Sequence, residues 1–92
     1  MTIPATPASP ADPQTLALEA LGWLLSDEDR AGRFLALTGL TPDALRAGLG
    51  NPGTLVAVID FLCAHEPDLV AAADALGVTP EALASTGRRL AA

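Results

Sequence analysis

The hydrophobic and polar positions along the chain are organised around one nearly unbroken apolar run, residues 54–64. On a helical wheel of about 100° per residue, the large apolar side chains of this run cover well over half of the circumference. Asp60 and a few small residues form the narrow stripe that is left. Because a surface helix needs only one apolar stripe, the run predicts a central helix that other helices wrap.

Shorter apolar stretches on both sides of this run predict further helices. Proline and acidic residues mark several starts, since both are favourable in the first turn of a helix. We expect a helix that opens at Asp12 and Pro13, one over residues 27–38, a short one from residue 41 that carries Leu45 and Leu49, one over residues 67–76 and one from residue 79. The pattern therefore predicts an all-α fold, a compact bundle of five or six short helices.

The second of these helices is expected to begin with Ser26 as its N-cap, with Asp29 three residues later completing an approximate capping box. Carboxylates at positions 27–29 are then stabilised by the positive end of the helix dipole. Metal binding is the alternative interpretation, but adjacent helical residues point in different directions and no second oxygen cluster occurs later in the chain. The helix should bury three apolar residues and end at a glycine: Phe34, Leu35, Leu37 and Gly39.

One seven-residue pattern occurs twice, at residues 39–45 and 77–83. Each copy reads Gly, Leu or Val, Thr, Pro, an acid, Ala and Leu. The glycine can end one helix in a left-handed conformation, and the threonine can cap the next. Each copy therefore predicts a tight corner between two helices, and duplication of a helix hairpin is left open.

The second corner also fits a helix-turn-helix over residues 69–90, the DNA-binding alternative. Ala73, Gly77 and Leu83 have the expected small, turn and buried spacing. Against this interpretation, Glu81 lies at the end of the helix where base contacts are normally made. Tight corners of other helical proteins produce the same pattern.

Charge argues against nucleic acid as a partner. The chain has five arginines, no lysine and eleven carboxylates, which gives a formal charge of −6. Binding to phosphates depends on Lys and Arg side chains that release counterions, so this balance has the wrong sign. We therefore expect a protein partner or self-association.

Compartment signals are few. A single cysteine cannot form an internal disulfide, and no run approaches the roughly 20 apolar residues of a membrane span. The N-terminus lacks the basic and apolar regions of a secretory signal. These features predict a soluble cytoplasmic protein that has no membrane partner.

Residues 1–11 have a different composition from the rest of the chain. Prolines at positions 4, 7 and 10 stand among Ala, Thr and Ser, with almost nothing to bury. This stretch predicts a disordered tail before a single helical domain over residues 12–92. The proline spacing also satisfies the P-x-x-P docking motif, but no basic residue flanks it.

Groups that could carry chemistry are scarce. Cys63 and His65 are the only thiol and imidazole, and two residues apart on a helix they face different directions. Zinc would lack further Cys or His ligands. We interpret Cys63 as a small core residue and His65 as a residue at the C-terminal end of a helix, where it interacts with the helix dipole. No catalytic, cofactor-binding or metal-binding residue is predicted, and the chain is not expected to be an enzyme.

Asp60 interrupts the central apolar run, and its environment is left open. It can face water, or it can be partly buried and paired with Arg30 or Arg33, since breaking a buried pair is strongly destabilising. In the exposed case, Asp60→Asn should change the free energy of unfolding by less than about 1 kcal/mol.

Five short motifs in combination resemble a known family. They are Trp-Leu at 23–24, Arg-Phe-Leu-Ala-Leu-Thr-Gly-Leu at 33–40, Leu-Arg at 45–46, Val-Ile-Asp-Phe-Leu at 58–62 and Glu at 66. In this order the chain is similar, over about residues 14–90, to a family of short alphaproteobacterial proteins described as a domain of unknown function. The resemblance implies a free-standing bacterial cytoplasmic helical protein and contributes no site residue.

The functional prediction is a small non-enzymatic interaction or regulatory module. Half of the residues are apolar, which is a surplus for a domain of this size and favours an exposed patch for a partner or a second copy. We expect partner contacts on the outer faces of the two corners and around five arginines that we predict to be exposed: Arg30, Arg33, Arg46, Arg88 and Arg89.

Overall fold

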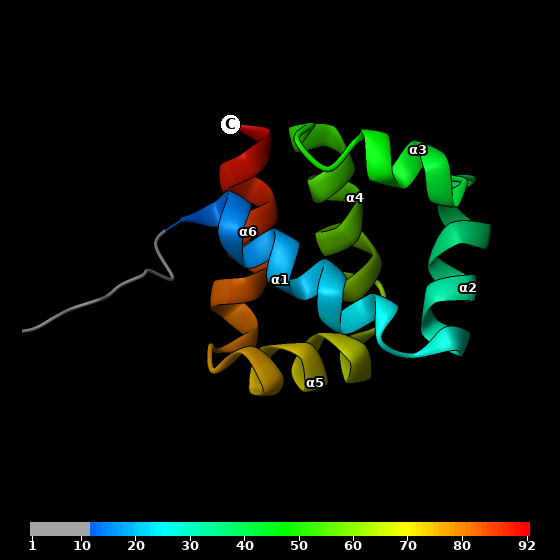
Figure 1. Cartoon of the computed structure of the whole chain (residues 1–92). Helices are drawn as coiled ribbons and strands as arrows, with labels where there is room; N and C mark the ends of the chain where they lie inside the picture. Colours follow the sequence, from blue (N-terminus) through cyan, green and yellow to red (C-terminus); the bar gives the residue numbers. More distant parts are fainter. Residues whose placement is uncertain (1–11) are drawn as a thin grey trace, which may run out of the picture.

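The computed structural model describes residues 12–92 and arranges them in six α-helices (Figure 1). Their bounds are Pro13–Leu25 (α1), Glu28–Thr38 (α2), Pro42–Ala47 (α3), Pro52–Cys63 (α4), Glu66–Leu76 (α5) and Pro80–Ala91 (α6). No strand occurs within residues 12–92, so the predicted all-α class is confirmed. The predicted tail, residues 1–11, lies outside the described residues.

Helix α4 is central, as predicted, but it shares this role with α6. The two helices lie side by side, run in opposite directions and make the most extensive contact in the fold (Figure 1). Helix α4 also contacts α1, α2 and α5. One hydrophobic core draws buried side chains from all six helices, and its α4 members are Leu55, Val58, Ile59, Phe61 and Leu62.

Both Gly-x-Thr-Pro corners form as predicted. Gly39 and Gly77 adopt left-handed conformations with φ of 76° and 74°, which a glycine adopts without the steric penalty of a β-carbon. The Oγ1 atoms of Thr41 and Thr79 each accept a hydrogen bond of 3.0 Å from the backbone N–H three residues later. The helices that these corners introduce differ in length, since α3 ends at Ala47 after 6 residues whereas α6 continues for 12.

The predicted N-cap of α2 is wrong by one residue. Asp27 is the N-cap, with extended backbone angles and a side chain that accepts from the backbone N–H of Arg30 at 3.0 Å. Ser26 still has helical angles and ends α1, where its hydroxyl donates to the Trp23 carbonyl at 2.5 Å. An extended backbone is what lets a side chain reach the free N–H groups, which explains the shift.

Two other expectations about helix ends and burial are also wrong. His65 does not lie at the C-terminal end of a helix: its backbone is extended, with φ of −136°, and it precedes the first turn of α5, which begins at Glu66 rather than Pro67. Leu37 is not buried, since its side chain is 73% exposed. Helix α2 lies at the edge of the bundle, and its one buried residue is Phe34, whose ring meets Phe61 edge-on with 5.3 Å between the centroids. Leu35 is partly buried against the core.

Candidate functional site

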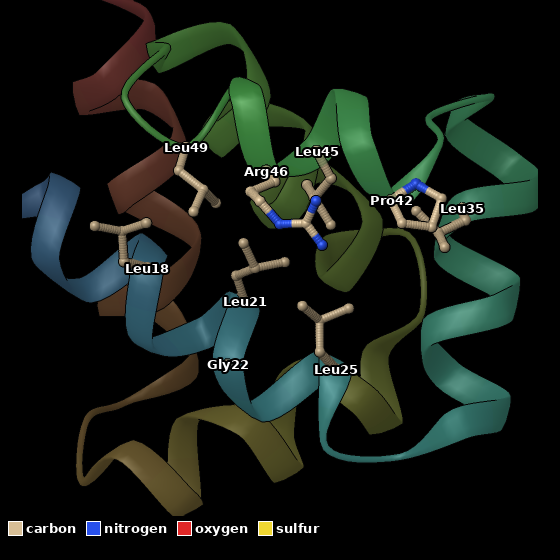
Figure 2. A pocket seen from close by; sticks show the side chains of 9 residues that line it. All are labelled: Leu18, Leu21, Gly22, Leu25, Leu35, Pro42, Leu45, Arg46 and Leu49. Atoms are coloured by element: carbon tan, nitrogen blue, oxygen red, sulfur yellow. The ribbon is translucent and has the colours of Figure 1, made fainter.

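A hollow of about 380 Å³ opens between α1, α2 and α3 (Figure 2). Its floor comes from α1, and its far wall comes from the end of α2, from α3 and from the turn after α3. We call it the α1–α3 groove and define it by its lining residues: Leu18, Leu21, Gly22, Leu25, Leu35, Pro42, Leu45, Arg46 and Leu49.

The floor of the groove is a second apolar stripe on α1. Leu18, Leu21, Gly22 and Leu25 have the i, i+3, i+4, i+7 spacing that places residues on one face of a helix. The buried residues Leu16, Ala17, Ala20 and Leu24 lie on the adjoining side of the helix and belong to the core. Helix α1 is therefore apolar on two sides, and on the second side the fold buries only Leu21.

The groove is open in its middle because of Gly22. A β-carbon placed on Gly22 would meet no atom within 4 Å. On the far side, α3 takes part in none of the extensive helix–helix contacts among the described residues. The short helix α3 therefore forms the far wall of the groove but does not pack extensively against α1.

Exposed leucines gather at this groove. Leu18, Leu25 and Leu49 are 36%, 41% and 37% exposed, and they are three of the five large apolar residues exposed in the described part of the chain. Figure 2 shows Leu18 and Leu49 together at one end and Leu25 at the other, with Leu21 between them. Clustered exposed apolar side chains of this kind mark interaction sites more often than isolated ones do.

Arg46 is the one charged residue among those that line the groove. Its guanidinium extends over the opening (Figure 2) and donates to the Asp43 carboxylate at 2.9 Å. The two side chains are 73% and 93% exposed. A pair this exposed is worth little, so Arg46 can exchange Asp43 for another carboxylate at low cost.

The other predicted contact arginines are spread over α2 and α6 and do not line the groove. Arg30 is not exposed as predicted: its side chain is 21% exposed, lies 3.8 Å from the centroid of the Trp23 ring and donates to the Trp23 carbonyl at 3.0 Å. Arg33, Arg88 and Arg89 are exposed as expected.

Arg33 connects α2 to α5 through a shared carboxylate. Its guanidinium donates to Oδ2 of Asp68 at 3.1 Å, and Nδ1 of His65 lies at the same distance from that oxygen. The Asp68 side chain is only 14% exposed. His65 therefore faces a carboxylate of the helix that it precedes, which agrees with its place before α5 rather than at the end of α4.

Asp60 and Cys63 both lie on the outer side of α4. Asp60 is exposed, so the alternative of a buried pair with Arg30 or Arg33 is wrong. Cys63 is exposed too, which corrects its assignment to the core. Partial desolvation, as the main cause, and the nearby Asp60 carboxylate raise the pKa of the Cys63 thiol, whereas Arg88 lowers it. A raised pKa reduces the thiolate fraction and with it the reactivity of the sulfur.

The described residues contain neither a metal-binding cluster nor a membrane span. Within residues 12–92, no group of three or more His, Cys, Asp or Glu side chains could hold a metal ion, including the acidic cluster at the start of α2. No helix in this part of the chain is both long and apolar enough to cross a membrane.

The sequence pattern predicts an exposed apolar patch but does not locate it. The signal is the Leu18 to Leu25 stripe, which is hard to separate in the sequence because α1 also carries the core residues Leu16, Ala17, Ala20 and Leu24. Pro42 belongs to the first corner, whose outer face is an expected contact region, and Arg46, which directly follows that corner, is one of the predicted contact arginines.

Comparison with known proteins identifies the family of this chain. A family model described as "Protein of unknown function (DUF3572)" matches residues 10–92, so the chain belongs to this family. No curated protein and no solved structure matches the chain.

Proposed function

We propose that this member of the DUF3572 family is a non-enzymatic interaction module that binds another polypeptide through the α1–α3 groove. The observation that carries the proposal is the concentration of half-exposed leucines, Leu18, Leu25 and Leu49, around one hollow. Burying each of them against a partner is worth on the order of 1 kcal/mol, since only about two fifths of each side chain is still exposed.

Gly22→Leu is the variant that tests this function. The new side chain meets nothing at its β-carbon, improves helix propensity and projects into the groove, so the protein should stay folded while the groove is filled. Gly32→Leu is the matched control, because Gly32 also lies inside a helix with no atom near an added β-carbon but is outside the groove.

The measurement is a quantitative pull-down from the native lysate with the wild-type chain and the two variants. We expect a stoichiometric protein that the wild-type chain and Gly32→Leu retain and that Gly22→Leu loses. Equal capture by all three chains, with both variants folded by circular dichroism, would contradict binding through the groove.

Self-association is the alternative to binding of another polypeptide. The concave shape of the α1–α3 groove disfavours self-association through this surface. A concave surface placed against its own two-fold image leaves an unfilled space, and two copies with a formal charge of −6 repel each other. Sedimentation equilibrium over a wide concentration range checks this: the mass of a monomer is expected throughout.

DNA binding by residues 69–90 is the alternative function. The left-handed Gly77, together with Ala73 and Leu83 fully buried in the α5–α6 corner, favours it. Against it, α6 is already packed on α1, α4 and α5, and exposed Glu81 precedes Arg88 and Arg89 on that helix. A mobility shift at low salt with micromolar protein tests it, and we expect no shift of any duplex.

The setting we propose is the bacterial cytoplasm. The resemblance over residues 14–90 and the lone Cys63, which needs no oxidising compartment, support it. Fractionation of the native host, with antibody detection of the chain, is the corresponding measurement.

A further inference from the structure

We propose that the occupant of the α1–α3 groove is a single amphipathic helix of a partner protein, which places one carboxylate against Arg46. This inference rests on the proposed function and adds the form and chemistry of the partner. Its apolar residues are expected at i, i+3 or i+4, and i+7.

The floor of the groove sets the spacing. Leu18 and Leu25 are seven residues apart on α1, which is about 10 Å or two helical turns. A helix laid along this floor presents side chains to it at the same period, so two or three anchors one turn apart match the stripe. An extended peptide presents alternate residues about 7 Å apart and does not match it.

Gly22 sets how closely the partner can approach. It lies between Leu18 and Leu25 on the stripe, and the space above it is empty. A large anchor residue of the partner can therefore descend between these two leucines toward Leu21, which is 4% exposed and forms the bottom of the groove. Small residues allow such close contact between helices, because no side chain holds the backbones apart.

Arg46 sets the polar part of the partner. Its guanidinium extends over the opening and its present partner, Asp43, is almost fully exposed. A carboxylate on the docked helix can take over this hydrogen bond in a partly desolvated position, where such pairs are stronger than at the open surface. Because the chain carries a formal charge of −6, the attraction is local, and we expect one carboxylate rather than an acidic run.

A second copy of the chain does not meet these conditions. Leu37 is the most exposed leucine and the one large apolar residue exposed on α2. If it entered the groove of another copy, the contact would join the α2 surface of one copy to the groove of the next, which are two different surfaces. Contacts of this kind continue from copy to copy unless they close into a ring. The net charge opposes such growth.

The experiment selects peptides on the wild-type chain from a phage library of random peptides of about 16 residues, which as helices are about 24 Å long. Counterselection on Gly22→Leu removes peptides that bind elsewhere. Enriched sequences are synthesised, and their affinities for the wild-type chain, Gly22→Leu, Gly32→Leu and Arg46→Glu are measured by fluorescence anisotropy.

We expect enriched peptides with large apolar residues at the helical spacing and one Asp or Glu. Their affinity should fall about tenfold or more on Gly22→Leu, which corresponds to the loss of one buried anchor, and should not change on Gly32→Leu. Arg46→Glu should weaken binding about twofold to fivefold, and a Lys in place of the peptide carboxylate should restore it.

The outcomes separate this inference from the proposed function. Enriched peptides that lose binding on Gly22→Leu but have alternating or proline-rich patterns, or no acidic position that responds to Arg46→Glu, overturn the helix and carboxylate while the groove remains a binding site. Selection of no peptide sensitive to Gly22→Leu overturns both. A dimer of the wild-type chain that Gly22→Leu abolishes shows that a second copy is the occupant and overturns the inference.

Discussion

Gly87 of α6 lies directly against Ile59 of α4, where the two central helices cross. A β-carbon on Gly87 would be 3.0 Å from Cγ2 and 3.3 Å from Cβ of Ile59, which is 1% exposed. Rotating the Ile59 side chain moves Cγ2 but leaves Cβ in place, so a methyl group at position 87 fits only if the backbone at this contact shifts slightly.

Gly87→Ala should therefore destabilise the protein by about 1 kcal/mol, because overpacking outweighs the gain in helix propensity. Gly32→Ala is the control: an added methyl group meets nothing within 4 Å there, and stability should rise by about 0.5 to 1 kcal/mol. Urea unfolding followed by circular dichroism measures both. If Gly87→Ala raised the free energy of unfolding as much as Gly32→Ala does, the contact between α4 and α6 would have space for the added methyl group.

Arg30 is predicted to stabilise the junction of α1 and α2 through Trp23. Stacking over the indole and the hydrogen bond to its carbonyl should together be worth about 1 to 2 kcal/mol. Arg30→Lys should recover little of the loss of Arg30→Ala, since an ammonium lacks the planar face and the donor geometry. Thermal unfolding and the emission maximum of Trp23 report the change.

Arg46→Ala provides the comparison for Arg30. Both side chains of its ion pair with Asp43 are largely exposed, so the free energy of unfolding should change by less than about 0.5 kcal/mol. If Arg30→Ala caused an equally small loss in the free energy of unfolding, the stacking of Arg30 on Trp23 would stabilise the protein no more than the exposed ion pair of Arg46 does.

Cys63 should react slowly with thiol reagents despite its exposure. Desolvation and the Asp60 carboxylate raise its pKa, so the thiol stays protonated to higher pH than a free cysteine does. Asp60→Asn removes one of these causes, lowers the pKa and should speed alkylation by iodoacetamide at about pH 8. An unchanged rate would show that the Asp60 carboxylate does not raise the pKa of the Cys63 thiol. Asp74→Asn, at an exposed carboxylate of α5, should leave the rate unaltered.

The same substitution at Asp60 also addresses stability. Because the side chain is exposed, Asp60→Asn should change the free energy of unfolding by less than about 1 kcal/mol. A denaturant melt measures this change, and a much larger loss would show that the carboxylate has a structural partner.

The two corners should respond differently to the same change. Thr79→Ala removes the N-cap of a core helix and should lower the global free energy of unfolding by about 1 kcal/mol. Thr41→Ala removes the equivalent bond from α3, which packs lightly, so its main effect should be local opening. Amide hydrogen exchange at Ala44, combined with urea unfolding, separates the two. Equal global losses would mean that α3 is coupled to the core as firmly as α6.

Much of this fold can be predicted from the sequence because its signals are local. Proline in the first turns, threonine caps and glycine stops indicate the helices and both corners. The apolar circumference of α4 indicates its central position. Helix α6 carries no such signal, since it enters the core with Thr86 and Gly87 as well as Leu83, and close helix contact through small residues depends on the partner.

The sequence-based predictions are wrong where the exposure of a side chain depends on residues of another helix. Arg30 is predicted to be exposed because nothing in the sequence places it over Trp23, seven positions earlier and in another helix. Cys63 is predicted to be in the core from its apolar neighbours, although it lies with Asp60 on the uncovered side of α4. The groove depends on the distance between α1 and α3, which no local pattern encodes.

Helix α3 makes few contacts with the other helices, so the shape of the groove depends little on the interactions that stabilise the fold. The far wall of the groove depends on a six-residue helix, whereas the core depends mainly on α1, α4, α5 and α6. Substitutions at Pro42, Arg46 or Leu49 should therefore change the shape and charge of the proposed binding site while the protein still folds. A groove of this kind can therefore change through a few residues without a change of the scaffold that carries it.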